Sequence, residues 1–431
     1  MITVVLRFTG HINFERLMTD LEGIVKRFRR FRQRIIRPNK IFQRPYWDDD
    51  PTFRLEDHVE RQDLPLPADE AAVENLANQV MNSALDFTHA LWKLTLVDNH
   101  PDGSILIVRV HHCIADGISL MRVLSLMTHT SSEIAAAQGS VVEPDQDGNQ
   151  SNRSSAGTQA VAQASPIMTN ATPGQGAMVR NPTFIDMLAA IARIAFRPPD
   201  PPTILKGPLG QVKKAVWSEP FSLSEIKKIA QSKQATINDV MMAVASGAIR
   251  GYMDLHKDDR KRNIRAFILV NLRGLSIDDE LGNKFGIVFL DLPLDREQPL
   301  DRLEGVKKGM DILKASAEYA ATYLILNLLG MLPGWIENIA TRFLDTKGTV
   351  VATNVPGSRK QLFLAEAPIQ SMFGWVPQSG RIGVGLSFVS YNGQLIVGLN
   401  VDVGLIPEPD KFIALFTEEY KSFRAAIPAD A

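Results

Sequence analysis

The sequence has almost no cysteine, no excess charge of either sign and no long hydrophobic run. Cys113 is the only cysteine among 431 residues, which excludes an internal disulfide and a CxxC metal or redox site. A single cysteine also fits a reducing compartment, so we expect a cytoplasmic protein. Lys and Arg number 47 and Asp and Glu number 48, a balance that argues against a protein that coats nucleic acid.

Residues 320–335 form the longest nearly apolar stretch, but they do not predict a membrane-spanning helix. Asn, Gly and Pro residues interrupt the stretch, and it is shorter than the roughly 20 residues that a spanning helix needs. We expect residues 323–335 and the apolar positions that follow to belong to the core or to line a tunnel, and we keep membrane anchoring as the alternative. Residues 1–7 show neither a basic leader nor a cleavage site, so they indicate a strand.

A low-complexity segment divides the chain. From Gln138 to Gly176, 27 of 39 residues are Gly, Ser, Gln, Asn, Pro, Thr or Asp, and none is aromatic or Leu. Such a segment buries too little apolar surface to offset its ordering entropy. We therefore predict an N-terminal lobe over 1–137, a flexible linker over 138–181 and a C-terminal lobe over 182–431.

Strand and helix patterns alternate in both lobes. Strongly apolar, β-branched segments predict strands over 3–8, 104–110, 265–270, 287–292, 383–391 and 394–401. Apolar residues spaced by three and four predict helices over 14–28, 118–127, 183–196, 222–230 and 238–255. Asn13 is expected to cap the first helix, and Asn392-Gly393 predicts a type I′ hairpin. The predicted fold class is therefore α/β with a mixed sheet in each lobe.

Two adjacent histidines, His111 and His112, are the strongest candidates for chemistry. They follow the predicted strand 104–110 and open a turn that contains Asp116 and Gly117. A neutral imidazole, with an ordinary pKa of about 6.5, can take a proton from a hydroxyl and pass it to a leaving group. Asp116 could orient the imidazole or pair with a distant arginine, and Gly117 could allow a positive φ before the next helix. The alternative is one core histidine, one solvated histidine and an ordinary turn.

The spacing His-His-x-x-x-Asp-Gly resembles the signature of the coenzyme A-dependent acyltransferase superfamily, which includes chloramphenicol acetyltransferases and nonribosomal peptide condensation domains. Further segments, in order along the chain, resemble the bacterial wax ester synthase/diacylglycerol acyltransferase family. They are Tyr46-Trp47 with Phe53, Asp57-His58-Val59, Leu85-Asp86, Leu91-Trp92, residues 236–240, Asn271-Leu272-Arg273, Leu281-Gly282-Asn283, residues 353–357, Ser390-Tyr391-Asn392-Gly393 and Asp402. The resemblance covers nearly the whole chain outside the linker.

This resemblance implies two chloramphenicol acetyltransferase-like lobes with an active-site tunnel between them, which acyl-CoA and an alcohol enter from opposite faces. His112 would be the general base, His111 a supporting residue, and Asp116 with Gly117 the structural part of the turn. No metal and no cofactor is implied, because acyl-CoA is itself a substrate. The residues that matching motifs place near the substrates are Asn238, Asp239, Asn271, Arg273, Asn283, Asn354, Pro356 and Gly357.

Asn238 and Asp239 allow two interpretations that are compatible with one another. The side-chain amide of Asn238 could donate to the oxyanion of a tetrahedral intermediate. Asn238 could also cap the helix that follows, with Asp239 in the first turn, where the helix dipole favours a carboxylate. Residues 354–357 predict a turn, which the resemblance places near the interface of the lobes.

The chain departs from the family pattern in three places. Ala90 precedes Leu91-Trp92 where the family usually has Pro, and Lys206 precedes Gly207-Pro208 where Asn is common. We also expect the family's first strand, and the segment before it, to be missing. That last departure bears on the N-terminal sheet and on one wall of the tunnel.

Seven positive charges lie within twelve residues, from Lys26 to Arg37. A solvated helix face is the simplest interpretation of such a run. Phe28 and Phe31 lie between the charges, so contact with phospholipid headgroups or with the phosphates of CoA is the functional alternative.

The leading hypothesis is an acyl-CoA-dependent O-acyltransferase that uses His112 as its base. It would transfer a long-chain acyl group to a fatty alcohol or to diacylglycerol, forming wax esters or triacylglycerol. A superfamily relative with another donor or acceptor, as in condensation domains, is the second hypothesis, and a non-catalytic protein of lipid surfaces is the third. We expect a monomer or homodimer, with peripheral contact to the inner membrane or to lipid droplets left open.

Overall fold

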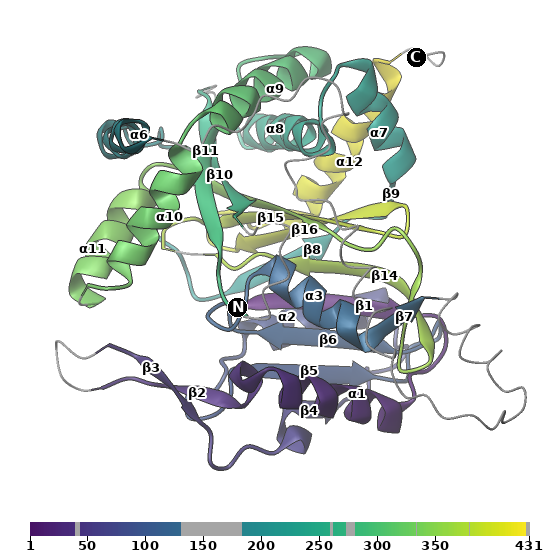
Figure 1. The fold of residues 1–431 in the computed structure, drawn as a ribbon. Helices are drawn as coiled ribbons and strands as arrows, with labels where there is room; N and C mark the ends of the chain where they lie inside the picture. The colour runs from purple at the N-terminus through teal and green to yellow at the C-terminus, as the bar shows by residue number, and fades with distance from the viewer. Residues whose placement is uncertain are drawn as a thin grey trace, which may run out of the picture.

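The computed structural model describes two sheets flanked by helices (Figure 1). The predicted linker over 138–181 and Arg273 lie outside the described residues. Within the described part of the chain, no helix combines the length and the apolar character that crossing a membrane requires. The described residues are 1–38, 44–130, 183–258, 262–272, 281–332, 334–378 and 380–427.

The first sheet has seven strands in the order β4-β5-β6-β1-β14-β13-β7. They are β1 (Ile2–Phe8), β4 (Val59–Arg61), β5 (Trp92–Val97), β6 (Ile105–Val110), β7 (Thr128–Thr130), β13 (Leu362–Leu364) and β14 (Ala367–Trp375). The predicted division at the linker therefore does not describe the sheets, since β13 and β14 come from the C-terminal half. β14 pairs antiparallel with β1 and satisfies an edge that β1 would otherwise leave open.

The second sheet has the order β11-β10-β12-β15-β16-β8, and β9 also pairs with β16. Parallel pairs join β12 to β10 and to β15, whereas the other pairs are antiparallel, so the predicted mixed sheet is confirmed. Asn392 and Gly393 have φ of 46° and 79°, as a type I′ turn requires. The strands are β8 (Lys213–Trp217), β9 (Phe221–Ser222), β10 (Ile264–Asn271), β11 (Phe285–Leu292), β12 (Val350–Pro356), β15 (Val384–Tyr391) and β16 (Gln394–Asp402).

The helices cover the sheets in separate groups (Figure 1). On the first sheet, α1 (Phe14–Arg27) and α3 (Gly117–Met127) pack on one face, and α2 (Glu70–Asn82) packs on the other. One face of the second sheet carries α7 (Leu223–Ser232), α8 (Ile237–Leu255), α9 (Pro299–Ala315) and α12 (Pro409–Ala425). Beside β10 and β11 lie α6 (Phe184–Phe196), α10 (Glu318–Leu329) and α11 (Gly334–Asp345).

Smaller elements follow α1 and precede α2. They are a two-stranded sheet of β2 (Gln33–Ile36) and β3 (Tyr46–Asp49), and the 3-10 helices η1 (Arg29–Arg32) and η2 (Leu55–His58). α1 forms as predicted, because the side chain of Asn13 accepts from Arg16 N at 3.1 Å and the helix buries one apolar stripe.

Two asparagines of α2 fasten the first sheet to the edge of the second. Asn78 donates to Ala215 O at 3.0 Å and accepts from Ala215 N at 2.7 Å. One helical turn later, Asn82 makes the same pair of bonds with the backbone of Lys213, at 2.7 and 2.9 Å. Each side-chain amide thereby pairs with backbone N–H and C=O groups of the edge strand β8, as a neighbouring strand would.

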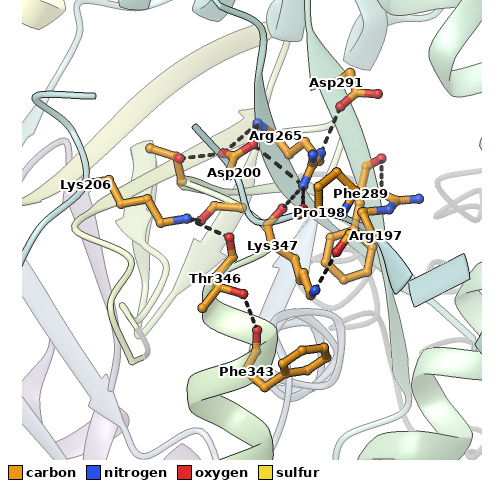
Figure 2. A network of polar contacts seen from close by, with 12 residues as sticks. Arg197, Pro198, Asp200, Lys206, Arg265, Phe289, Asp291, Phe343, Thr346 and Lys347 are labelled. Atoms are coloured by element: carbon orange, nitrogen blue, oxygen red, sulfur yellow. Dashed lines mark hydrogen bonds and ion pairs between the residues drawn. The ribbon is translucent and has the colours of Figure 1, made fainter. Parts of the chain in front are cut away.

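A polar network ties the segments after α6 and α11 to the start of β10 (Figure 2). Asp200 accepts from Arg265 N at 3.0 Å, and Arg265 Nη1 donates to Pro198 O at 2.8 Å and to Lys347 O at 2.9 Å. Lys206 Nζ donates to Thr346 O at 2.9 Å. The charged groups of this network thus have ion-pair or backbone partners, which offset the cost of burying them.

Candidate active site

The turn between β6 and α3 holds both histidines. The backbone N–H of His111 donates to Leu91 O at 2.9 Å, so the buried Leu91-Trp92 pair supports the start of the turn. Asp116 then caps α3, and its Oδ1 accepts from Ser119 N at 2.9 Å. The predicted order of strand, histidine turn and helix is confirmed.

His112 lines a cavity and is held by a residue far away in the sequence. Its Nδ1 lies 3.1 Å from Asn283 Oδ1, and Asn283 Nδ2 donates to the backbone carbonyl of His112 at 2.8 Å. Since the amide NH2 is engaged with that carbonyl, the amide oxygen accepts from Nδ1–H, and the ring lone pair is then on Nε2. Burial lowers the pKa of His112, and the Asn283 bond offsets part of this effect. His112 therefore has the neutral form that a general base needs.

His111 faces away from the cavity. Its Nδ1 lies 2.8 Å from Cys113 Sγ, and its ring meets Phe87 edge-on at 5.4 Å between centroids. Burial lowers the pKa of His111 to about 4 and raises the pKa of the Cys113 thiol to about 11. Both groups are therefore uncharged near neutral pH, which suits a supporting role for His111.

Asp116 joins the histidine turn to the segment that precedes β11. Its Oδ2 accepts from Lys284 N at 3.0 Å, and its Oδ1 accepts from Ser119 Oγ at 2.8 Å. Asp116 is buried, and its backbone N–H donates to Gly282 O at 3.4 Å. These contacts hold backbone in place, which favours the predicted structural role over proton transfer.

The cavity lies between the first sheet and the helices α1 and α3, and one end reaches β10, β12 and β15 of the second sheet. Its volume is about 200 Å³. The floor of the cavity consists of three tiers of side chains that are register partners on neighbouring strands. The first tier is Ile2, Val110 and Trp92, the second is Val4, Val108 and Leu94, and the third is Leu6, Leu106 and Met372. The first and third tiers are four residues apart, or about 14 Å.

Polar lining is concentrated at the end where His112 lies. Asn271 ends β10, Thr353 and Asn354 belong to β12, and all three line the cavity. Phe285, the register partner of Asn271, places its ring 5.7 Å from the imidazole of His112. The arrangement suits a long apolar chain whose reacting group lies beside His112.

Comparison with known families assigns the chain to one of them. Residues 6–241 match the family model for the wax ester synthase/diacylglycerol acyltransferase catalytic domain, and residues 281–424 match the WS/DGAT C-terminal domain. The chain belongs to the wax ester synthase/diacylglycerol acyltransferase family. This is a family of acyltransferases that use acyl-CoA with an alcohol or diacylglycerol.

Relatives of this family are similar along most of the chain. A Mycobacterium tuberculosis protein named as a probable diacylglycerol O-acyltransferase is 25% identical over 90% of this chain and 84% of its own. The O-acyltransferase WSD of Acinetobacter baylyi is 23% identical over 89% and 84%.

Solved structures support the fold. The wax ester synthase/diacylglycerol acyltransferase of Marinobacter aquaeolei VT8 matches with a TM-score of 0.66 at 18% identity, covering 98% of this chain and 94% of its own. The starter condensation domain of rhizomide synthetase matches with a TM-score of 0.60 at 13% identity, covering 99% and 91%.

The family motif at Asn238 and Asp239 lies at the start of α8. Thr236, not Asn238, caps this helix, so that interpretation of Asn238 was wrong. Thr236 accepts from Asp239 N at 3.2 Å while Asp239 accepts from Thr236 N at 2.8 Å, a complete capping box. Neither Asn238 nor Asp239 is among the cavity-lining residues, so a catalytic role for Asn238 stays a prediction.

Among the other predicted site residues, Asn271 and Asn354 line the cavity and Asn283 contacts His112. Gly117 lines the cavity, but its φ is not positive, and it is simply the first residue of α3. The predicted turn over 354–357 was wrong for Asn354 to Pro356, which end β12. A Cβ at Gly357 would lie 2.5 Å from Ser390 O, so this position requires glycine for close backbone approach.

The basic run is not one solvated helix face. It crosses α1, η1 and β2, and Phe28 and Phe31 are buried, so these rings are not available for lipid contact, whereas contact of the charges with phosphate groups stays a prediction. The charges have local partners: Arg29 pairs with Asp49 at 2.6 Å, and Arg30 lies 4.2 Å from the Trp47 ring centroid.

The apolar stretch that begins at Tyr323 was also misjudged. Leu324, Leu328, Trp335, Ile339 and Phe343 are exposed and none lines the cavity, so the expected core or tunnel position was wrong. Periodicity marks an apolar helix face, but it does not reveal whether another element covers that face.

Sequence reasoning named Asn283 but missed that it holds His112, and it missed Phe285 and the cavity floor. The alternating apolar residues of β1 and β6 carried the signal for a lined strand face, though not for a cavity. In the described ranges, no group of three or more His, Cys, Asp or Glu side chains is placed to bind a metal ion.

We expect His112→Ala to lower kcat by about 10²–10⁴-fold, because a positioned general base supplies this much. His111→Ala should cost less, since its ring faces Phe87 and Cys113. Steady-state kinetics at matched melting temperatures test this, and the opposite order of the two variants would reverse the assignment.

Asn283→Ala should lower kcat by about 10–100-fold, because the Nδ1–H of His112 loses the acceptor that fixes ring and tautomer. Asn283→Asp keeps an acceptor and adds a negative charge, which stabilises the protonated imidazole. The pKa of His112 should then rise, and the acidic limb of kcat/KM should move to higher pH. An unshifted pH profile in an active Asn283→Asp variant would contradict the contact.

Proposed function

We propose that the protein transfers a long-chain acyl group from acyl-CoA to the hydroxyl of a fatty alcohol or diacylglycerol, with His112 as general base. The observation that carries this proposal is the position of His112, whose Nδ1 is committed to Asn283, at the polar end of an apolar cavity. A condensation-type reaction shares the fold, but the apolar lining favours a lipid chain over an aminoacyl group.

In the proposed reaction, Nε2 of His112 removes the proton of the acceptor hydroxyl while its oxygen attacks the thioester carbonyl. The carbonyl π electrons move to oxygen and form a tetrahedral oxyanion. When the oxyanion collapses, the carbon–sulfur bond breaks, and the CoA sulfur receives the proton from His112. The products are an ester and CoA thiol, and the imidazole returns to its neutral form.

The amides of Asn271 and Asn354 are the proposed donors to the oxyanion. Both line the polar end of the cavity. Asn271 belongs to β10 and Asn354 to β12, and these two strands are neighbours in the second sheet. Removing one such donor typically lowers kcat by about 10²–10³-fold. Asn238, the donor predicted from the family motif, is absent from the cavity lining and is the weaker candidate.

The three tiers of the cavity are proposed to hold the acyl chain. Wax ester and triacylglycerol formation share a single unbranched acyl donor, whereas their acceptors differ in size. The narrow apolar space beneath α1 and α3 therefore suits the shared chain. Because the acceptors are insoluble in water, we further propose that the enzyme works in the cytoplasm against a membrane or lipid-droplet surface.

The function is tested with purified protein and palmitoyl-CoA, offered hexadecanol, dioleoylglycerol or no acceptor. Free thiol release should depend on the acceptor, and the matching ester should appear by mass spectrometry. Thiol release without an acceptor, unchanged by either alcohol, would instead indicate a thioesterase. A complete lack of thiol release, with the protein folded, would refute the proposed activity.

Val108→Phe should shorten the acyl chain that the enzyme accepts more than Leu106→Phe does, because Val108 belongs to the middle tier and Leu106 to the third. Both variants should keep activity on short-chain acyl-CoA, since the first tier and His112 are unchanged. A series of acyl-CoA donors with one acceptor measures the cut-off. Equal loss for all chain lengths, or a shift only in a series of alcohols, would contradict the acyl assignment.

A further inference from the structure

The exposed apolar side chains of this protein are concentrated on three neighbouring helices. Within the described ranges, 11 of the 16 large exposed apolar residues belong to α6, α10, α11 or the α10–α11 connection. We call them the apolar platform. The platform consists of Phe184, Ile185, Leu188, Phe196, Leu324, Leu328, Met331, Leu332, Trp335, Ile339 and Phe343.

Platform residues on α10 and α11 recur at helical spacing. Trp335, Ile339 and Phe343 are each four residues apart on α11, and Leu324 and Leu328 repeat this spacing on α10. α10 contacts both α6 and α11, and the three helices project together beside β10 and β11 (Figure 1). Clustering of this kind distinguishes an interaction surface from the scattered apolar residues of an ordinary surface.

Buried polar contacts hold the platform helices from beneath. Arg197, after α6, pairs with Glu318 of α10 at 3.1 Å, and Glu318 accepts from Phe289 N of β11 at 3.0 Å. Lys347, after α11, donates to Arg197 O and lies 4.0 Å from the ring centroid of Phe343 (Figure 2). The charges of this network are thus paired beneath the platform helices.

The platform is connected to the active site through the edge strand β11. Thr322 of α10 accepts from Ile287 N and donates to Ile287 O, both at 2.8 Å. A Cβ at Gly286 would collide with the backbone of Tyr319, so α10 lies directly against the strand there. The preceding residue, Phe285, contacts the ring of His112. A surface bound to α10 is therefore close to the reacting end of the cavity.

Composition decides which occupant suits the platform. The segment 138–176 has no aromatic residue and no Leu, so it offers little apolar surface with which to cover 11 large side chains. The exposed charges of α6 and α11 are balanced, with Asp186 and Glu337 against Arg193 and Arg342. An apolar face that is rich in aromatic residues and has no net charge complements a neutral lipid–water interface rather than an anionic surface.

We propose that the apolar platform docks onto a lipid surface that carries no net charge. Docking would bring the cavity close to substrates that are dissolved in that lipid. This inference rests on the proposed use of lipid substrates, and it adds the contact surface. Docking is apolar, so it should persist at high salt, unlike binding through the basic run.

Flotation with dioleoylphosphatidylcholine vesicles, at low and at high salt, tests the proposal. Wild-type protein should float at both salts. The double variant Trp335→Gln/Ile339→Gln should partition at least about tenfold more weakly, because it removes two side chains that are 60% and 61% exposed. The matched control is Leu66→Gln/Leu255→Gln, which removes two exposed apolar residues elsewhere and should bind like wild type.

Both double variants should keep the wild-type melting temperature and the wild-type activity on a water-soluble short-chain alcohol and acyl-CoA. Activity on dioleoylglycerol in vesicles should fall only in the platform variant.

Vesicle binding by the platform variant that equals wild-type binding would overturn the proposal, as would wild-type binding that requires anionic lipid and disappears at high salt. A wild-type dimer that the platform variant converts to monomer, with vesicle binding unchanged, would assign the platform to a second copy. Vesicle binding through the platform without any acyl transfer would refute the proposed function alone.

Discussion

The candidate active site depends on the hydrogen bonds between the histidine turn and residues 282–284. Asn283 contacts both Nδ1 and the backbone carbonyl of His112, and Asp116 accepts from Lys284 N. These partners are separated by about 170 positions, so His112 has a fixed orientation only after the two halves of the chain have assembled. The same two halves of the chain are joined by the pairing of β14 with β1 in the first sheet, and by the hydrogen bonds from Asn78 and Asn82 to β8.

At the edge of the second sheet, charged groups lie inside and apolar groups lie outside. Arg265, Asp200, Arg197 and Glu318 are at least half-buried, and each has charged or backbone partners, which offsets part of the cost of desolvation. Removing one partner would leave an unpaired charge and destabilise the protein more than loss of an exposed ion pair. These contacts join the segments that follow α6 and α11 to α10 and β11, beneath the apolar platform.

Local patterns predicted the elements well, whereas pairing between distant segments was not visible in them. Asn13 capped α1 as predicted, but nothing in residues 367–375 indicates that they pair with β1. Thr236 with Asp239 is a readable capping-box signal that was overlooked in favour of Asn238. The motif located His112, but the tautomer of its ring depends on Asn283, which is distant in the sequence. Likewise, the sequence of α11 does not show whether another element covers its apolar face. Sequence reasoning therefore reaches residue types and local order, not three-dimensional partners.

Ester formation in water competes with hydrolysis, so an apolar site serves two purposes. The apolar lining offers water few hydrogen-bond partners, but burial also lowers the pKa of His112 and makes it a weaker base. Asn283 restores part of the basicity by accepting from Nδ1–H, which would stabilise the imidazolium of the proposed general-base step. His111, with its pKa lowered to about 4, stays neutral beside it. A positively charged neighbour would depress the basicity of His112 further, so a neutral His111 is compatible with the proposal that His112 takes up the proton.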